Sequence, residues 1–264
     1  ILLSAYFLIK NHRISWKNLI FGGLSLGMAA TIKLVPLGVI PVFIIYLFKK
    51  LLKEKESGLK ILGRLGMFGL LAILPVILVF IPYLSVWENG IVPHVIGYKT
   101  AWGIWGPSFL LRRFEESGIW LEVVTPIISL FKQQGLWIML LSIFSYAIVF
   151  WGSFNLISGI FLVFLTMTVF SPYFAIQYLL WVIPFWLILR IDLRSFILYN
   201  FFVIALYFLL VFEWTDPGIW IFIGNILHIN DRVFFINLYS LPLIAGWLVV
   251  FLLWQKVVRA GMEK

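Results

Sequence analysis

Cysteine is absent from this 264-residue chain, and charged residues make up only 12% of it. The absence of cysteine excludes disulfides, a thiol nucleophile and a cysteine-ligated metal. Soluble domains usually carry about 25% charged residues. This chain is apolar instead, with 63% hydrophobic residues and a mean hydropathy of +1.07. The composition therefore predicts an integral membrane protein.

Several signatures of nucleotide-dependent and metal-dependent enzymes are also missing. There is no P-loop, no G-x-G-x-x-G and no H-E-x-x-H motif, so the sequence does not support an ATP-driven pump. The three histidines, His12, His94 and His228, are too widely spaced to suggest a metal site. We therefore expect neither a metal ion nor another cofactor.

The net charge of +9 comes from basic residues that cluster between apolar runs. Such clusters are typical of cytoplasmic loops, so we expect no nucleic acid partner. The four clusters are Lys10, Arg13 and Lys17; Lys49, Lys50, Lys53, Lys55, Lys60 and Arg64; Arg190 and Arg194; and Lys256, Arg259 and Lys264.

The apolar run from Leu19 to Phe48 lies between the first two clusters, so it must cross the membrane an even number of times. A full crossing needs about 20 residues, and the run is too short for two. It fits two half-length helices joined near Lys33–Pro36, because proline disfavours helix at the residue before it. This predicts a re-entrant hairpin with Lys33 at its tip, facing a polar cavity. The alternative is one long tilted helix with Lys33 reaching the interface.

Further apolar runs complete the predicted fold class, an all-α polytopic transmembrane bundle of about six full spans plus the re-entrant helical hairpin. We expect residues 1–264 to form a single transmembrane domain. The segment Ile1–Ile9 has the character of the end of a helix, so we expect the chain to be the C-terminal part of a longer protein. The predicted spans are Gly66–Tyr83, Gly135–Trp151, Leu156–Phe170, Phe174–Leu189, Phe196–Phe212 and Leu238–Trp254.

Two long loops, 85–134 and 213–237, are expected on the outer side of the membrane. From Ile119 to Phe131, apolar residues recur every three or four positions, which predicts short amphipathic helices lying at the membrane surface. Pro126 interrupts this stripe, so we expect Thr125 and Pro126 to begin a second helix. Loops of this length are usually functional when they are not disordered.

The first outer loop contains "HVIGYKTAWGIWGPSFLLRRFEE", residues 94–116, in which basic residues stand among tryptophans. Lys and Arg are scarce on the outer side of membrane proteins. Lys99, Arg112 and Arg113 therefore suggest an anionic partner such as a phosphate, with Tyr98 as a neighbouring candidate contact. The alternative for the arginines is binding to lipid headgroups or ion pairing on a surface helix with Glu115 and Glu116.

A second stretch, "SPYFAIQYLLWVIPFW", combines an outer turn with polar and aromatic residues that enter a helix broken again at Pro184. Gln177 and Trp181 are four residues apart, so they would share one face of an α-helix. The alternative is that the aromatic residues anchor the chain at the interface. Several outer carboxylates could act as a general base, but spacing assigns none of them: Glu88, Glu115, Glu116, Glu122, Glu213, Asp216 and Asp231.

Three stretches, in their order, resemble the GT-C superfold of integral membrane glycosyltransferases, and most of all the polyprenol-phosphate-mannose-dependent mannosyltransferase family. They are "GLSLGMAATIKLVPLGVIPVF", "YKTAWGIWGPSFLL" and "SPYFAIQYLLWVIPF", within about residues 20 to 190. The family's first motif is a helix of small residues that ends in Lys, followed by an apolar residue or two and then Pro, which Lys33 and Pro36 match. Its third motif is matched by Ser171, Pro172, Gln177, Tyr178, Leu179, Leu180, Trp181 and Pro184.

The resemblance implies inverting transfer of a sugar, such as mannose, from a polyprenyl-phosphate carrier to a hydroxyl acceptor at the outer face. It places the catalytic base, a carboxylate of the first external loop, upstream of Ile1. It also implies a multi-pass protein of a prokaryotic plasma membrane, with the lipid-linked donor and membrane lipid as partners. The implied donor site consists of Lys33, Lys99 and Arg112 around the departing phosphate, with Tyr98, Gln177, Tyr178 and Trp181 around the sugar or carrier.

Two other classes stay open on the sequence alone. A lipid-linked-sugar flippase or secondary transporter would also use an intramembrane lysine. Transporters commonly repeat a broken segment in two halves, and residues 135–254 contain no counterpart of the hairpin. A non-catalytic subunit of a membrane complex is the third class, since the family's base is not among these residues.

Overall fold

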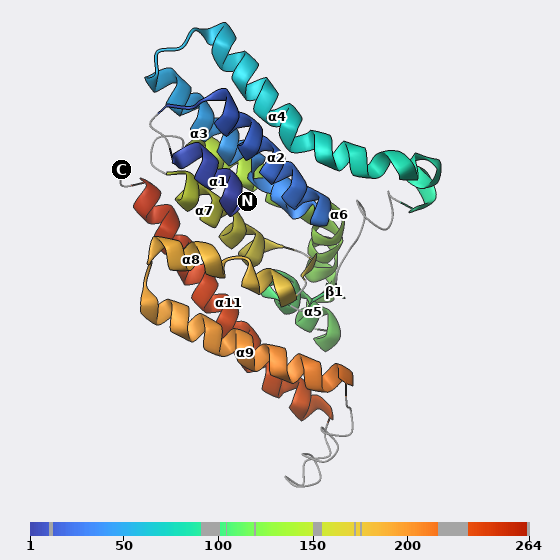
Figure 1. Cartoon of the computed structure of the whole chain (residues 1–264). Helices are drawn as coiled ribbons and strands as arrows, with labels where there is room; N and C mark the ends of the chain where they lie inside the picture. Colours follow the sequence, from blue (N-terminus) through green and yellow to red (C-terminus); the bar gives the residue numbers. More distant parts are fainter. Residues whose placement is uncertain are drawn as a thin grey trace. The chain divides into compact units, whose positions relative to one another are not determined.

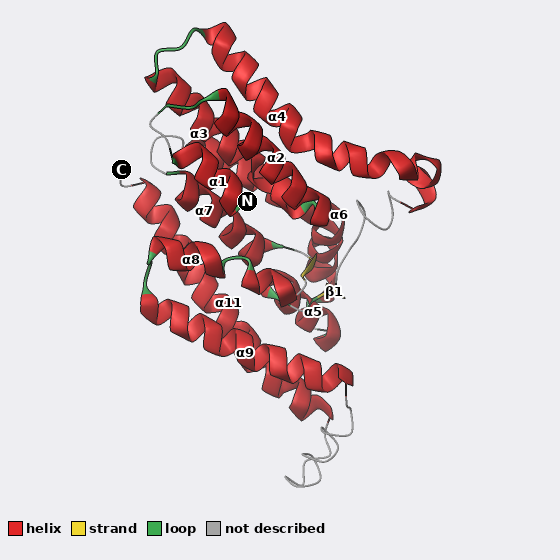
Figure 2. Cartoon of the chain, in the orientation of Figure 1, coloured by secondary structure: helices red, strands yellow, loops and turns green. Residues whose placement is uncertain are grey.

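The computed structural model describes residues 1–10, 13–90, 101–103, 105–118, 120–149, 155–171, 173–174, 176–215 and 232–262. The regular structure of this part is helical apart from one pair of two-residue strands, which confirms the all-α class (Figure 2). The chain divides into two compact units. Unit 1 comprises Ile1–Lys99 and Leu140–Val163, and unit 2 comprises Thr100–Met139 and Phe164–Glu263.

Unit 1 contains the break that the sequence predicts at Lys33–Pro36. The helix before the break starts after Ser15, whose side chain caps it by accepting from the backbone N–H of Asn18. It ends at Ile32, and Lys33 takes an extended conformation. The elements of this part are α1 (Leu2–Ile9), α2 (Trp16–Ile32), the 3-10 helix η1 (Val35–Val39), α3 (Ile40–Lys53), α4 (Gly58–Phe80) and the 3-10 helix η2 (Ile81–Val86).

Hydrogen bonds tie the start of α2 to the end of α3 and the start of α4. The backbone N–H of Ile14 donates to the Glu54 carboxylate at 3.0 Å. The guanidinium of Arg64 donates to the carbonyl of Ile14 at 2.8 Å. Helices α2 and α3 therefore form an antiparallel hairpin, and Lys33 lies at the end away from these loops. The first two basic clusters share one end of unit 1, as the sequence predicts.

The arms of the hairpin are longer than expected. Helix α2 has 17 residues, and Val35–Lys53 is an apolar helical stretch of 19 residues. At 1.5 Å per residue, each arm is about 25–28 Å long, close to the hydrocarbon thickness of about 30 Å. The prediction of two half-length helices is therefore wrong, because the helices extend past Leu19 and Phe48 into the basic clusters. Lys33 lies nearly one membrane thickness from the basic end.

Glycines allow α2 and α4 to pack side by side, as Figure 1 shows. A Cβ on Gly23 would lie 2.8 Å from the Leu71 Cβ. A Cβ on Gly27 would lie 2.7 Å from the Pro75 Cγ and 2.8 Å from the carbonyl oxygen of Ala72. This G-x-x-x-G spacing brings membrane helices together. The same residues fit G-x-S-x-G, but that motif marks a nucleophile only on a strand-to-helix turn, and here it lies inside α2.

Unit 2 contains the outer-loop helix, the two strands and the last helices of the chain, while α6 and α7 contribute to both units. Its elements are β1 (Ala101–Trp102), α5 (Gly106–Ser117), α6 (Leu121–Val149), α7 (Leu156–Phe170), β2 (Tyr173–Phe174), the 3-10 helix η4 (Ile176–Leu180), α8 (Ile183–Leu189), α9 (Leu193–Thr215) and α11 (Arg232–Met262).

Helix α6 differs from the prediction at its start. It begins at Leu121 and continues through Pro126, so the prediction that Thr125 and Pro126 start a separate helix is wrong. Proline near a helix start removes only one hydrogen bond, which the rest of a long helix tolerates. The axis bends by 67° between Leu121–Gly135 and Trp137–Ser145. The bend falls where the sequence predicts a change from surface helix to span.

The predicted span Phe174–Leu189 is not a single helix. Its first part is η4, and α8 contributes only seven α-helical residues. Pro184 stands in the first turn of α8, where backbone N–H groups have no acceptor within the helix, so the missing N–H of proline costs no hydrogen bond. The proline therefore begins a helix here, and the prediction that it breaks one is wrong.

The third and fourth basic clusters also meet at one end. The ammonium of Lys256, near the end of α11, lies 3.0 Å from the Asp192 carboxylate, just before α9. Hydrogen bonds from Lys256 and from the backbone N–H of Ser195 hold the pKa of Asp192 below its usual range. Helices α9 and α11 are thus antiparallel, and their basic ends coincide as predicted.

Three helical stretches of the described residues are long and apolar enough to cross a membrane, namely Val35–Lys53, Gly58–Gly90 and Pro242–Ala260. The bent α6 would be a fourth. Apolar side chains such as Leu70, 57% exposed, cover the free side of α4 and suit lipid contact. Helices α7 and α9 provide shorter apolar stretches. The predicted total of about six spans stays a prediction.

Replacing Gly27 tests the α2–α4 contact. In Gly27→Ala, the added methyl group meets the backbone of α4, and such overpacking costs about 1–3 kcal/mol. This exceeds the gain in helix propensity, at most about 1 kcal/mol. We expect the thermal unfolding midpoint of the purified protein to fall.

Gly66→Ala is the matched control, because it lies in α4 and its added Cβ would meet no atom within 4 Å. We expect its midpoint to stay the same or rise. Equal midpoints for the two variants would contradict close packing of α2 on α4.

Candidate functional site

Two of the three motif stretches come together in unit 2. Strand β1 pairs antiparallel with β2, and Ala101 lies opposite Phe174 while Trp102 lies opposite Tyr173. The hydroxyl of Ser171 donates to the carbonyl of Tyr173 and shapes the turn into β2. Segments about 70 residues apart are therefore held side by side by backbone hydrogen bonds.

The tryptophan after β1 anchors the outer loop to α7. Trp105 is only 1% exposed, and its indole N–H donates to the carbonyl of Thr168 at 2.7 Å. Trp247 of α11 donates in the same way to the carbonyl of Val169 at 3.1 Å. These carbonyls belong to the last turn of α7, whose acceptors have no partner within the helix. Two indoles therefore supply the missing donors.

Gly106 completes this junction. Its φ of +61° favours glycine, and a Cβ would lie 3.0 Å from the carbonyl oxygen of Val169. From the sequence, Trp105 was expected at the membrane interface or on a sugar face, and a junction with α7 was not predicted. The repeated Trp-Gly pairs in "AWGIWG" were the signal, because glycine beside a large aromatic residue indicates close backbone approach.

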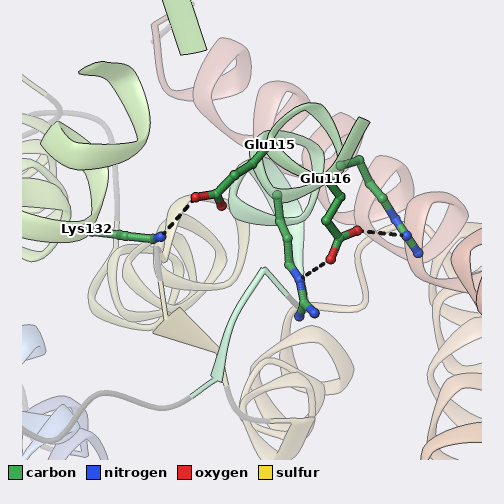
Figure 3. Close-up of polar contacts among 5 residues, drawn as sticks. Glu115, Glu116 and Lys132 are labelled. Atoms are coloured by element: carbon green, nitrogen blue, oxygen red, sulfur yellow. Dashed lines mark hydrogen bonds and ion pairs between the residues drawn. The ribbon is translucent and has the colours of Figure 1, made fainter. Parts of the chain in front are cut away.

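Arg112 of α5 lies against the turn after β1. A Cβ on Gly103 would lie 2.7 Å from the Arg112 Cβ and 2.9 Å from its Cγ, and the φ of Gly103 is +73°. The stem of the arginine thus covers a position that only glycine leaves open. Its guanidinium forms an ion pair with Glu116 at 2.8 Å, and Arg113 reaches the same carboxylate at 3.1 Å (Figure 3).

Glu115 makes the third ion pair of Figure 3, with Lys132 of α6 at 3.6 Å. The carbonyl of Lys132 accepts from the hydroxyl of Tyr173 at 2.9 Å, which ties β2 to α6. The alternative that the two arginines form ion pairs with glutamates is therefore observed, and Glu116 is the partner of both. These pairs are about half exposed, so each contributes at most about 1 kcal/mol and leaves the guanidinium able to exchange partners.

The third motif has a different helix type from the one predicted. Residues Ile176–Leu180 form a 3-10 helix, in which positions three apart share a face. The prediction that Gln177 and Trp181 share an α-helical face is therefore wrong. Tyr178 and Trp181 come together instead, with ring centroids 4.5 Å apart. Phe164 of α7 supports Trp181 edge-on at 6.1 Å, so the two rings form a firm aromatic pair.

Lys33 belongs to unit 1 and is described separately from the residues above. It is half-buried at the end of α2, and its backbone N–H donates to the carbonyl of Ala29. Its position at the hairpin tip is the one predicted. Tyr98, Lys99 and Pro172 lie outside the described residues, and Gln177 is described in its backbone alone.

The chain was compared with known protein families, curated proteins and solved structures, and none of them matches it. The three motif stretches are therefore the sole basis for the resemblance.

Replacing Gly103 tests whether the Arg112 stem packs on the turn after β1. In Gly103→Ala the added Cβ collides with the arginine stem, so the stem must leave the turn after β1. Alanine at positive φ costs about 1–2 kcal/mol by itself, and displacing a packed side chain adds about 1–3 kcal/mol. We expect a clear fall in the thermal unfolding midpoint.

Gly118→Ala provides the comparison, since Gly118 has a φ of +71° but its Cβ would meet nothing within 4 Å. It should show the backbone cost alone. A fall as large in Gly118→Ala as in Gly103→Ala would contradict the packing of Arg112 on Gly103.

Proposed function

We propose that this protein transfers a sugar, such as the hexose mannose, from a polyprenyl-phosphate carrier to a hydroxyl acceptor at the outer face of the membrane. The observation that carries the proposal is the pairing of β1 with β2. It joins the stretch that contains Lys99 and Arg112 to the stretch that contains Gln177, Tyr178 and Trp181. The resemblance requires these two motifs to act on one donor, and a backbone link between them supports that requirement.

In the proposed reaction, the acceptor oxygen attacks the anomeric carbon with inversion. The bond from that carbon to the phosphate oxygen breaks, and the polyprenyl phosphate leaves with the electron pair. A base takes the hydroxyl proton, and no residue of 1–264 is assigned to that role. Charge grows on the phosphate as the bond breaks, so cations fixed in advance lower the barrier.

The resemblance assigns three cations to the donor phosphate, namely Lys33, Lys99 and Arg112. Arg112 is held over Gly103 and shares Glu116 with Arg113. Its planar fork suits phosphate oxygens, and a phosphate would compete with Glu116 for it. Tyr98, Gln177, Tyr178 and Trp181 are assigned to the sugar or carrier. The Tyr178–Trp181 pair offers an aromatic face of the kind that stacks on a sugar ring.

The proposed fold is of the GT-C type, with about six full spans besides the hairpin, in a prokaryotic plasma membrane. The length of the hairpin arms changes the depth at which we expect Lys33 to lie in the membrane. With the basic end on the cytoplasmic side, an arm of about 25 Å supports a position of Lys33 near the outer headgroup level, where the phosphate of an outward-facing carrier would lie. A lysine there avoids the full cost of a charge at the bilayer centre.

Donor binding by a Lys33 variant tests the proposal. We expect Lys33→Ala to raise the Kd of the full-length protein for polyprenyl-phosphate mannose by about 10- to 100-fold, as for loss of a charged hydrogen bond. Lys33→Arg should retain most of the affinity. Binding is measured by calorimetry in detergent micelles, and transfer is measured with radiolabelled donor.

Arg194→Ala is the control, because Arg194 is an exposed cation at the basic end of unit 2. An equal Kd for Lys33→Ala and Arg194→Ala would contradict the role of Lys33. If the unchanged protein moves the donor across a vesicle membrane and leaves the sugar–phosphate bond intact, the transferase proposal is wrong and a flippase is indicated.

A further inference from the structure

The basic end of unit 1 carries more cations than its carboxylates can neutralise. The acidic residues of segment 1–64 are Glu54 and Glu56, and both face inward. Glu54 accepts from the backbone N–H of Ile14, and Glu56 pairs with Arg64 at 3.0 Å. The Arg64 and Glu56 side chains are only 15% and 17% exposed. Exposed cations remain, and we name them the cationic patch: Lys10, Arg13, Lys17, Lys53, Lys55 and Lys60.

The contacts of Arg64 hold the patch in a fixed arrangement. Arg64 also donates to the carbonyl of Ile14 and lies over the ring of Trp16, 5.3 Å from its centroid. Lys50 donates to the carbonyl of Leu8 at 2.9 Å. Arg64 and Lys50 thus join the loops that carry the patch, so the exposed cations present a preorganised array.

Exposed apolar side chains border the patch. Trp16 is 49% exposed, Leu52 47%, Leu59 83% and Leu62 66%. In the sequence, Trp16, Leu52 and Leu59 each directly precede a patch lysine, and Leu62 lies two residues after one. Lysines whose stems cross apolar surface while their charges reach a polar layer are typical of the membrane interface. A soluble anion would leave the apolar border in water, whereas a lipid would cover it.

We propose that the cationic patch binds anionic glycerophospholipids of the leaflet at the basic end. The phosphates contact the six cations, and the acyl chains cover Trp16, Leu52, Leu59 and Leu62. This binding is independent of the proposed transferase activity, because the patch and Lys33 lie at opposite ends of α2. Its strength must fall with ionic strength, since screening acts on exposed charges.

Lipid selectivity of the purified full-length protein in phosphatidylcholine bilayers tests this. Spin-labelled phosphatidylglycerol and spin-labelled phosphatidylcholine are compared by the fraction immobilised on the protein. We expect phosphatidylglycerol to be preferred by about threefold or more, and 1 M NaCl to reduce this preference strongly. The triple variant K53Q/K55Q/K60Q should lose most of the preference, while K53R/K55R/K60R should keep it.

Each other outcome counts against the proposal. No preference in the unchanged protein overturns it, and so does an unchanged preference in the glutamine variant. Displacement of the labelled lipid by millimolar inorganic phosphate would assign the patch to a free anion. The salt titration needs no variant, so the test stands even if the glutamine variant fails to fold.

Discussion

The contacts of Arg64 with Ile14 and Glu56 set the direction of the helices in unit 1. They hold the start of α4 against the loop before α2, and Glu54 brings the end of α3 to the same place. Because the start of α2, the end of α3 and the start of α4 meet, α2 and α4 run parallel to each other. Helix α3 runs antiparallel to both. The glycines of α2 can then pack on α4, and Lys33 is carried to the far end of the hairpin.

A second set of contacts organises the outer loop. The indoles of Trp105 and Trp247 donate to the last turn of α7, and β1 pairs with β2 just beyond it. Gly103 and Gly106 permit this approach, because each has a positive φ and neither position has room for a Cβ. The loop that carries Arg112 is therefore fixed to the helix that precedes the third motif. A site made from two distant segments needs such a link.

Parts of this arrangement could be predicted because their causes are local. A break at Lys33–Pro36 was predicted and α2 does end there, although Val35, which Pro36 was expected to exclude from a helix, begins η1. The basic residues predicted which helix ends meet. Other parts depended on contacts that the sequence does not reveal. Helix bounds beyond Leu19 and Phe48 depend on capping by Ser15 and on ties such as Arg64 to Ile14. The helix type of η4 was likewise not visible in the sequence, so the pair of Tyr178 and Trp181 lies where an α-helical face was predicted.

From the α2–α3 hairpin we infer that Lys33 lies on the side of the membrane opposite the basic end. The absence of cysteine makes single-cysteine variants clean probes of this claim. Leu34→Cys marks the hairpin tip, and Ser57→Cys marks the α3–α4 turn at the basic end. A membrane-impermeant maleimide added outside intact cells should label Leu34→Cys, and should label Ser57→Cys only after permeabilisation. Labelling of both positions from the same side would contradict it.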